Sequence, residues 1–358
     1  MAETMRAQVF YEKEKMSLEE VAVPEIGADD VLVKVKDVGI CGSDISYYFG
    51  MSPLGTDSGK GPMVLGHEFT GIVAKVGKIP ATKGLFKEGD RVVVNPVQHC
   101  NACPACASGN THTCQNLSVP GVTTDGGFAE YCVSNYTGLF KLPDNVSFQA
   151  GAMTEPLACA VNGMNKLDIE PGQFVTVIGP GAIGMMMVQI ARAYGAGKVA
   201  LVGTRDYRLE KGREYGADYL FNTKDEKSPY YAKDLKEALA DVTHGRLAER
   251  VIVPAGPNEA FETGVEIAGE TGIIVHFGLP DEGAVFKIPA LSFHTMDKQI
   301  RSAWLAPMVW PQTIRMVEEG LVELESLVTH VRPLEETGQA IVDLRNRVDD
   351  PMKVEIEM

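Results

Sequence analysis

The chain lacks several features that would place it among membrane, secreted or repetitive proteins. No apolar run of about 18 residues occurs, so we expect no transmembrane helix and no membrane partner. The opening stretch, MAETMRAQVFYEKEKM, has no apolar core of the kind that a secretory signal needs. No repeat with a period of roughly 20–50 residues and no low-complexity tract is present. We therefore expect a globular, cytoplasmic protein.

Positive charge is also scarce. Lysine and arginine number 33 against 48 aspartates and glutamates, which gives a formal net charge of −15 and an isoelectric point near 5.0. Such a charge disfavours nucleic acid as a partner. The hydrophobic fraction of 45% and the charged fraction of 23% are ordinary for folded domains. With 358 residues, the chain exceeds the usual size of a single hydrophobic core, which predicts two domains.

The first part of the sequence has the pattern of short β-strands broken by turns. Strand candidates lie at residues 31–38, 69–76 and 91–94. Residues 50–61 are rich in glycine, serine and proline and are expected to form a loop. This pattern predicts a barrel-like or sandwich-like domain.

The pattern changes near residue 171, where strand and helix candidates begin to alternate. Residues 174–178 form a strand candidate, and residues 182–194 form an apolar stretch of helical length. Further strand candidates lie at residues 199–202, 219–221, 250–253 and 273–277. This alternation predicts right-handed βαβ units and a parallel sheet. After about residue 295 the pattern indicates helices at residues 312–319 and 334–344 and a strand at residues 353–356.

Four of the seven cysteines crowd together as Cys100, Cys103, Cys106 and Cys114. Structural zinc sites take four ligands in a tetrahedron, and thiolates are favoured ligands. Two-residue gaps let one loop wrap three sulfurs around an ion, and a further turn supplies the fourth. No ligand position is then left for substrate, so this pattern predicts a structural zinc. The alternative is four free or disulfide-paired thiols, which a reducing compartment disfavours.

A glycine-rich string, Gly179-Pro-Gly181-Ala182-Ile183-Gly184, follows the strand candidate at residues 174–178 and opens the helix candidate. This context is the one that a dinucleotide-binding loop requires. Gly179 permits the tight turn, Gly181 lets the backbone approach a pyrophosphate, and Gly184 allows close packing of helix and strand. The alternative is an ordinary strand–turn–helix junction.

The next strand candidate ends in Gly203-Thr204-Arg205. NAD-binding units usually place a carboxylate here to bind the ribose 2′-hydroxyl. A small residue, a hydroxyl and a guanidinium instead suit a 2′-phosphate, which favours NADP over NAD. Asp206 follows directly and could serve NAD if the turn is shifted. Arg205 could also be a solvent-exposed residue or stack on the adenine.

A third group of residues is dispersed along the chain: Cys41 with Ser43 and Asp44, then His67 with Glu68, and then Glu155. Cysteine, histidine and glutamate together make a plausible zinc site. Each residue alone has a simpler interpretation, as a small buried cysteine, a core histidine or a surface carboxylate. Their spacing does not connect them.

A family resemblance does connect them. The string Gly66-His-Glu-Phe-Thr-Gly-Ile-Val-Ala-Lys-Val-Gly77 resembles the catalytic-domain signature of zinc-dependent medium-chain alcohol dehydrogenases. Cys41-Gly-Ser-Asp44 with Tyr47-Tyr48 is similar to the sorbitol/xylitol, or polyol, dehydrogenase branch. The four-cysteine segment, Gly126-Gly-Phe-Ala-Glu-Tyr131, Thr154-Glu-Pro156 and the glycine loop follow in the family's order, so the resemblance covers essentially the whole chain.

The resemblance implies a catalytic zinc held by Cys41, His67 and a carboxylate, in addition to the structural zinc. Either Glu68 or Glu155 supplies that carboxylate in such enzymes, and the two can exchange. Ser43 matches the hydroxyl that relays the proton of the alcohol. We therefore expect two zinc ions per subunit, with zinc acting as a Lewis acid on the alcohol.

The resemblance also implies the architecture and the reaction. We expect a GroES-like β-rich catalytic domain from residues 1–155 and 295–358, with a Rossmann domain of residues 156–294 inserted into it. The expected reaction transfers a hydride between a secondary alcohol, a polyol or sugar-derived alcohol, and NAD(P), giving the ketone. Relatives of this kind are homodimers or homotetramers.

Other functions remain open. The segment Ser302-Ala-Trp-Leu-Ala-Pro-Met-Val309 is more apolar than a sorbitol enzyme would require. An amino alcohol such as threonine, or a simple secondary alcohol, is therefore an alternative substrate. The alternative from another class is a non-catalytic NAD(P)-binding relative, which the presence of Cys41, Ser43, His67 and Glu68 disfavours.

Overall fold

A computed structural model describes residues 3–52, 61–281 and 283–358, so most of the loop expected at residues 50–61 lies outside the described residues. The chain forms two compact units. Unit 1 comprises residues 1–158, 306–320 and 324–358, and unit 2 comprises residues 159–305 and 321–323. From the sequence, the domain boundaries are expected after residues 155 and 294. In the part of the chain that is described, no helix is long and apolar enough to cross a membrane.

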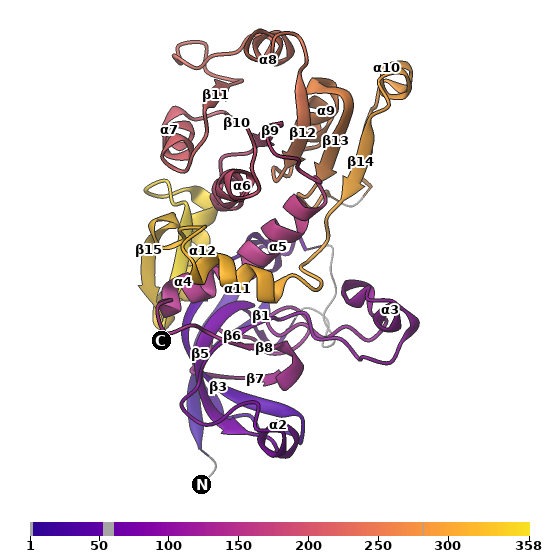
Figure 1. The fold of residues 1–358 in the computed structure, drawn as a ribbon. Coiled ribbons are helices and arrows are strands. Elements are labelled where there is room, and N and C mark those ends of the chain that lie inside the picture. The colour runs from indigo at the N-terminus through magenta and orange to yellow at the C-terminus, as the bar shows by residue number, and fades with distance from the viewer. Residues whose placement is uncertain (1–2, 53–60, 282) are drawn as a thin grey trace. The chain divides into compact units, whose positions relative to one another are not determined.

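Unit 1 is built on two β-sheets (Figure 1). The larger sheet has the order β15-β16-β3-β5-β6-β8, with β7 also paired to β3. Its strands are β3 (Asp30–Gly39), β5 (Glu68–Val76), β6 (Arg91–Val94), β7 (Tyr131–Asn135), β8 (Leu139–Lys141), β15 (Val328–Pro333) and β16 (Lys353–Glu357). The smaller sheet has the order β2-β1-β4, formed by β1 (Thr4–Glu12), β2 (Lys15–Ala22) and β4 (Met63–Val64). The last strand of the chain, β16, thus pairs with β3 from the beginning of the chain.

The helices of unit 1 are short. They are α1 (Gly42–Tyr48), α2 (Lys78–Thr82), α3 (Pro104–Ala107), α4 (Phe148–Ala152), α11 (Trp310–Glu318) and α12 (Thr337–Asn346). Single 3-10 turns occur at η1 (Thr111–Thr113), η2 (Tyr136–Gly138), η3 (Glu325–Leu327) and η4 (Leu334–Glu336). Helix α5 (Thr154–Asn165) begins in unit 1 and ends in unit 2.

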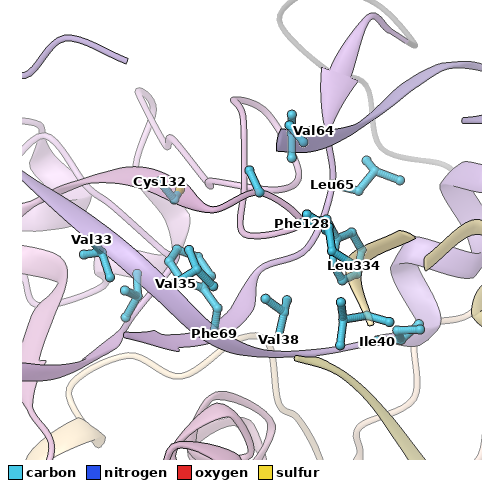
Figure 2. Packing of buried hydrophobic residues seen from close by; sticks show 14 of the residues in the cluster. Val33, Val35, Val38, Ile40, Val64, Leu65, Phe69, Phe128, Cys132 and Leu334 are labelled. Atoms are coloured by element: carbon cyan, nitrogen blue, oxygen red, sulfur yellow. The ribbon is translucent and has the colours of Figure 1, made fainter. Parts of the chain in front are cut away.

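In the core of unit 1, branched aliphatic side chains of β3 pack with aromatic rings from other segments of the unit (Figure 2). Val33, Val35 and Val38 are almost fully buried, as are Phe69 of β5 and Phe128. Val33 and Val35 follow the period-2 pattern of the sequence, and a register shift between Val35 and Asp37 interrupts it before Val38. This packing fixes β5, and therefore the two residues at its beginning that enter the site described below.

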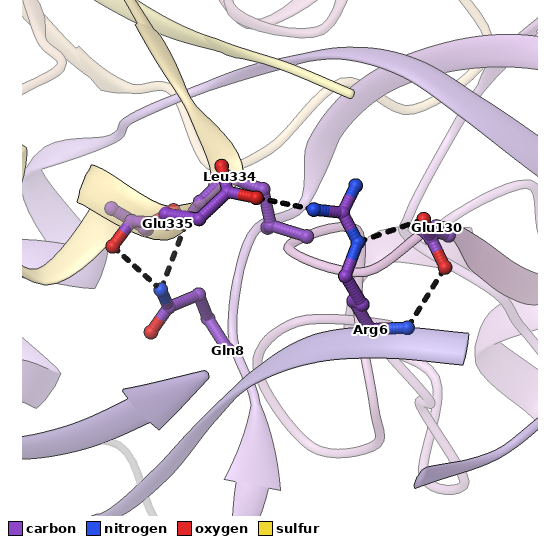
Figure 3. A network of polar contacts seen from close by, with 6 residues as sticks. Arg6, Gln8, Glu130, Leu334 and Glu335 are labelled. Carbon is purple, nitrogen blue, oxygen red and sulfur yellow. Dashed lines mark hydrogen bonds and ion pairs between the residues drawn. The ribbon is translucent and has the colours of Figure 1, made fainter. Parts of the chain in front are cut away.

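Polar contacts join the N-terminal strand to the return segment (Figure 3). The Arg6 guanidinium pairs with Glu130 and with Glu335, and its backbone N–H donates to Glu130 Oε2 at 2.8 Å. The buried Gln8 amide donates to the carbonyl oxygens of Leu334 and Glu335 at 2.8 and 3.2 Å. The bonds of Gln8 connect residues that are more than 300 positions apart in the sequence.

Unit 2 contains a six-stranded parallel sheet with the order β11-β10-β9-β12-β13-β14 (Figure 1). Its strands are β9 (Phe174–Ile178), β10 (Lys198–Gly203), β11 (Tyr219–Asn222), β12 (Ala248–Val253), β13 (Ala268–His276) and β14 (Gln299–Ser302). Its helices are α6 (Ala182–Ala193), α7 (Asp206–Glu214), α8 (Leu235–Thr243), α9 (Asn258–Ile267) and α10 (Ala290–Thr295). The strand order reverses between β9 and β12, and α/β sheets bind ligands at such a reversal.

The expected architecture is confirmed: a GroES-like β-rich domain and an inserted Rossmann-type sheet. The strand candidates at residues 91–94 and 174–178 agree with the strands residue for residue. The helix expected at residues 334–344 begins as the turn η4 and continues as α12. The sequence pattern did not single out β1, whose side chains are mostly buried, or β2, whose side chains are mostly exposed or half-buried.

The acidic residue before β11 provides a test of the folded Rossmann unit. Asp218 accepts hydrogen bonds from the Val199 N–H at 2.8 Å and Lys198 Nζ at 3.0 Å, and it pairs with Arg192. Burial alone would raise the pKa of Asp218, but these three donors outweigh burial and hold it below the ordinary 3.8. A folded-state pKa below the unfolded one means that the stabilisation is complete above 3.8 and is lost as the pH falls through the folded value.

We therefore predict that Asp218→Asn lowers the melting temperature by a few degrees at neutral pH. The difference from the parent protein should shrink steadily as the pH falls below 3.8. Thermal unfolding followed by circular dichroism across this range measures it, with the exposed Asp241→Asn on α8 as the control. A difference that does not change with pH would contradict the assigned pairing.

Candidate active site

The four-cysteine segment folds into a closed cluster of sulfur atoms. Cys103 immediately precedes α3, and its Sγ lies 3.5 Å from that of Cys106 and 3.9 Å from that of Cys114. Cys114 Sγ lies 3.5 Å from Cys100 Sγ. A tetrahedron of thiolates with zinc–sulfur bonds of about 2.3 Å separates its sulfurs by about 3.8 Å. The observed spacing therefore fits a zinc ion, and all four positions are filled by protein.

Backbone N–H groups point at these sulfurs and favour their ionised form. The N–H groups of Cys100 and Asn116 donate to Cys114 Sγ at 3.4 and 3.3 Å, and the Cys103 N–H donates to Cys100 Sγ at 3.4 Å. Hydrogen bonds from the Ala102 and Cys103 backbone lower the pKa of Cys100 to about 6. Thiolates are the form that binds metal, so these bonds prepare Cys100 for a cation, whereas burial raises the pKa of Cys106 to about 12.

A second group consists of Cys41, His67 and Glu68, whose ligand atoms all lie within 4.8 Å of one another. Cys41 precedes α1, whereas His67 and Glu68 stand at the beginning of β5. Gly66 holds the chain before them at φ +89°, and a Cβ there would lie 2.9 Å from the Phe128 ring. The core of unit 1 thus forces the turn that brings His67 and Glu68 towards Cys41.

Asp44 fixes the orientation of this group. It is fully buried, and its carboxylate accepts hydrogen bonds from the Cys41 N–H at 2.8 Å and the Gly66 N–H at 3.2 Å. Its Oδ1 lies 3.7 Å from His67 Nδ1, so the imidazole presents its other nitrogen, Nε2, towards the ligand side. No hydrogen bond joins the two groups at this distance, so Asp44 acts on His67 through its charge.

The charges in this pocket favour a cation. Burial alone would lower the pKa of His67, but Cys41, Asp44 and Glu155 outweigh it and raise that pKa well above 6.5. Ser43 Oγ lies 3.5 Å from His67 Nε2, where a hydroxyl can both accept and donate a proton. One sulfur, one nitrogen and one carboxylate oxygen, with one position left open, is the donor set of a catalytic zinc site.

The two candidate carboxylates are placed differently. Glu68 belongs to the group with Cys41 and His67, and its Oε2 is hydrogen-bonded to the buried ammonium of Lys353. Glu155, in the first turn of α5, is also buried, but it does not belong to this group of described residues. Its negative charge nevertheless acts on His67. The structure therefore places Glu68 nearest the other ligands, with Glu155 as a nearby second carboxylate.

The glycine loop of unit 2 has the geometry that a dinucleotide needs. Gly179 has φ +126°, and a Cβ at Gly184 would lie 1.9 Å from the Gly179 carbonyl oxygen, so neither position accepts a side chain. A Cβ at Gly181 would have no neighbour within 4 Å, which leaves that backbone open to a pyrophosphate. Ala182 and Ile183 follow in the first turn of α6, whose N–H groups face the same side.

The turn after β10 carries two residues that could bind the ribose or its 2′-phosphate, Arg205 and Asp206, and their side chains are placed differently. Thr204 is exposed, and the half-buried Arg205 lies 5.7 Å from the centre of the Tyr207 ring. Gly203 packs against Pro180, because a Cβ there would lie 2.5 Å from its ring. Asp206 is turned inward: its Oδ1 accepts hydrogen bonds from Asn222 Nδ2 at 2.7 Å and Ser228 Oγ at 2.6 Å.

Comparisons with known proteins agree with this arrangement. Residues 27–144 match the alcohol dehydrogenase GroES-like domain, and residues 182–319 match the zinc-binding dehydrogenase domain. The chain is similar to the sorbitol dehydrogenase of Bacillus subtilis strain 168, with 30% identity over 95% of this chain and 93% of the relative. It is also similar to D-xylulose reductase A of Aspergillus oryzae, with 31% identity over 92% of this chain and 91% of the relative.

The chain belongs to the zinc-dependent medium-chain alcohol dehydrogenase family. Its solved structural neighbours include a zinc-binding dehydrogenase from Sinorhizobium meliloti 1021 bound to NADP, with a TM-score of 0.88 and 28% identity over 99% of this chain and 100% of that one. An alcohol dehydrogenase from Escherichia coli CFT073 complexed with NADH has a TM-score of 0.88 and 29% identity over 99% of both chains. This dehydrogenase is therefore a zinc enzyme with a nicotinamide cofactor, which confirms the expected enzyme class.

Sequence reasoning named Asp44 without giving it a role, and it missed the roles of Lys353 and Gly39. Asp44 stood in the quoted motif, and its place three residues after Cys41, at the start of a helix, is a signal of a capping role. Lys353 and Gly39 carried no such signal, because they reach Glu68 only through the pairing of β16, β3 and β5.

Proposed function

We propose that this dehydrogenase oxidises a secondary alcohol, a polyol or a sugar-derived alcohol, to the ketone and passes the hydride to NAD(P). The observation that carries the proposal is the convergence of Cys41, His67 and Glu68 beside the Ser43 hydroxyl. This group can hold one metal ion and take up one proton, which are the two requirements of alcohol oxidation.

Each residue of the group has a defined task in this proposal. Cys41, His67 and Glu68 hold the catalytic zinc, which when bound lowers the pKa of the substrate hydroxyl. Ser43 relays the proton of that hydroxyl: its Oγ accepts this proton while it gives up its own, which passes on to water. Asp44 keeps the His67 ring in place, and the burial of His67 and Glu68 limits the access of water. A nicotinamide bound at the glycine loop would supply the acceptor for the hydride.

A polyol substrate is supported by the relatives, which are named for sorbitol and xylulose. The apolar segment at residues 302–309 favours the alternative of a simpler secondary alcohol. An amino alcohol such as threonine is the remaining alternative. A panel of sorbitol, xylitol, threonine and propan-2-ol with both nicotinamide cofactors distinguishes these substrates.

We further propose a second, structural zinc at the four cysteines and a homodimer or homotetramer as the working assembly. Exposed apolar side chains in unit 2 support self-association: Val285 is 76% and Leu291 78% exposed. A cytoplasmic location accords with the four closely spaced thiols, which hold zinc only where disulfides do not form.

NADP is the proposed cofactor. The inward hydrogen bonds of Asp206 leave its Oδ1 occupied by Asn222 and Ser228, so this carboxylate is a poor acceptor for ribose hydroxyls. Thr204 and Arg205 stand at the same turn with a hydroxyl and a guanidinium, both donors for a phosphate. The competing role for Arg205 is stacking on the adenine, which would serve either cofactor.

The first prediction concerns catalysis. His67→Ala removes a zinc ligand, so kcat/KM should fall by at least about a thousandfold, since Lewis-acid catalysis contributes several kcal/mol. Binding of the cofactor should stay unchanged, because the glycine loop belongs to unit 2. Nicotinamide absorbance measures turnover and fluorescence titration measures cofactor binding, with His294→Ala on α10 as the control. Undiminished turnover in His67→Ala would refute the assigned site.

The second prediction concerns the metal content. Elemental analysis should find two zinc ions per subunit in the parent protein. Cys103→Ser should lose one ion and lower the melting temperature strongly, because the binding energy of a structural zinc is part of the folding energy. Cys41→Ser should lose the other ion with a much smaller change in stability. One ion or none in the carefully purified parent would contradict the two-site assignment.

The third prediction concerns the cofactor. Arg205→Ala should lower kcat/KM for NADP by about one to two orders of magnitude, because a charge-assisted hydrogen bond contributes roughly 1.5–3 kcal/mol. The value for NAD should change little. Arg213→Ala, which removes an arginine farther along α7, is the matched control. A parent enzyme that prefers NAD, or unchanged NADP use in Arg205→Ala, would show that Arg205 does not bind the phosphate.

A further inference from the structure

The carboxyl group of Glu355 is fully buried and lacks a partner. The side chain is 0% exposed, and neither of its carboxyl oxygens accepts or donates a hydrogen bond within the described part of the chain. Burying a polar group without a hydrogen bond is costly. A methionine or leucine would fill this place at lower cost, so the carboxyl group requires an explanation beyond packing.

Glu355 stands in one row with a metal ligand. On β16 it lies opposite Gly39 of β3, and Gly39 lies opposite Glu68 of β5. Residues that are directly paired across strands project to the same face, as do residues two positions apart on one strand. Glu355, Glu68 and Lys353 therefore share one face of the sheet, with Gly39 between the two carboxyl groups.

Lys353 fills the space above this glycine. A Cβ at Gly39 would lie 2.9 Å from Lys353 Cε, 3.0 Å from Lys353 Nζ and 2.3 Å from Glu68 Oε2. The ammonium donates to Glu68 Oε2 and, at 3.0 Å, to the Ile40 carbonyl oxygen. These bonds use two of its three donors. The ammonium thus lies between Glu68 on one side of Gly39 and Glu355 on the other.

We propose that Glu355 is a positioning residue, the second acceptor for the Lys353 ammonium, which allows Lys353 to release Glu68 when Glu68 binds the catalytic metal. The inference rests on the catalytic metal site of the proposed function. Lys353 and a metal ion compete for the same carboxylate of Glu68. A buried ammonium cannot leave one partner without another nearby, because an unpaired buried charge is strongly unfavourable.

The charges around Glu355 are compatible with this role. Burial raises the pKa of Glu355 to about 9, with Asp37, Glu68 and Glu325 adding to the rise and Lys353 opposing it. A neutral carboxyl group is far less costly to bury than a carboxylate. This explains why Glu355 can stay buried without a hydrogen-bond partner among the described residues. Its carbonyl oxygen accepts a hydrogen bond from an ammonium in either protonation state.

The test measures metal affinity on the full chain, independently of turnover. The catalytic site is emptied with a chelator while the four-cysteine site keeps its ion, and Co²⁺ is then titrated in, because its visible spectrum reports the ligand set. Cys41→Ser, which lacks one ligand of this site, gives the blank. Glu355→Met should weaken Co²⁺ binding about tenfold, as removal of groups behind metal ligands does, and should alter the spectrum.

Two further variants, measured in the same Co²⁺ titration, distinguish an effect of the lost hydrogen-bond acceptor from an effect of altered packing. Glu355→Gln keeps a carbonyl oxygen as acceptor and should bind Co²⁺ within about twofold of the parent, well short of the tenfold effect. Glu357→Gln, two residues farther along β16 and exposed, is the matched control and should leave binding unchanged. The melting temperature of Glu355→Met should be equal to or above that of the parent, since an apolar side chain replaces a buried carboxyl.

A double-mutant cycle decides whether Glu355 acts through Lys353. In a Lys353→Met background, Glu355→Met should have no further effect on Co²⁺ affinity. Should Lys353→Met fail to fold, Lys353→Gln provides the equivalent background, because its neutral amide can still bond Glu68 but carries no buried charge that needs a second partner. Two outcomes overturn this inference and leave the proposed function intact. One is an effect of Glu355→Met that persists in these backgrounds, and the other is a Co²⁺ affinity of Glu355→Met equal to that of the parent. A parent protein that binds no Co²⁺ beyond the Cys41→Ser blank overturns the proposed function as well.

Discussion

The arrangement of this enzyme depends on one constraint: charged groups that must face a metal are buried inside a β-rich unit. Asp44 and Glu68 are at most 2% exposed, and His67 is 7% exposed. Buried charges are tolerated only when they are paired or fully hydrogen-bonded. Backbone N–H groups of Cys41 and Gly66 satisfy Asp44, and Lys353 satisfies Glu68. Because Lys353 lies on β16, the last strand of the chain completes a site that the first third of the chain begins.

The same constraint explains the crowding at the glycines of the site. The Lys353 ammonium reaches Glu68 only because Gly39 offers no side chain between them. Gly66, held at φ +89° against the Phe128 ring, turns the backbone so that His67 and Glu68 enter β5 beside Cys41. A packed core and an ion pair thus set the ligand positions together, so the metal site is a product of the unit's folding and is not an addition to its surface.

The sequence predicted the features that depend on residues close together in the chain, and it did not predict those that depend on distant residues. The glycine loop after β9 and the four cysteines around α3 are local, so their spacing sufficed to predict the strand, turn and helix of the loop and the clustering of the four sulfurs. The grouping of Cys41, His67 and Glu68 required the family resemblance, because no spacing joins α1 to β5. Lys353 and Glu355 could not be found, since strand register across β16, β3 and β5 is set by long-range packing.

Asp206 and Glu68 differ in the kind of group that donates hydrogen bonds to them, and this difference decides how easily each carboxylate can change partner. Asp206 is held by Asn222 and Ser228, neutral donors on the segment that follows β10. Displacing it would leave the fully buried Asn222 amide without this acceptor, which holds Asp206 inward. Glu68 is held instead by an ammonium on a flexible four-carbon stem, which can pass to another acceptor without losing its charge pairing. A carboxylate that must stay out of a site is best held by fixed neutral groups, whereas one that must enter a site needs a partner that can move away.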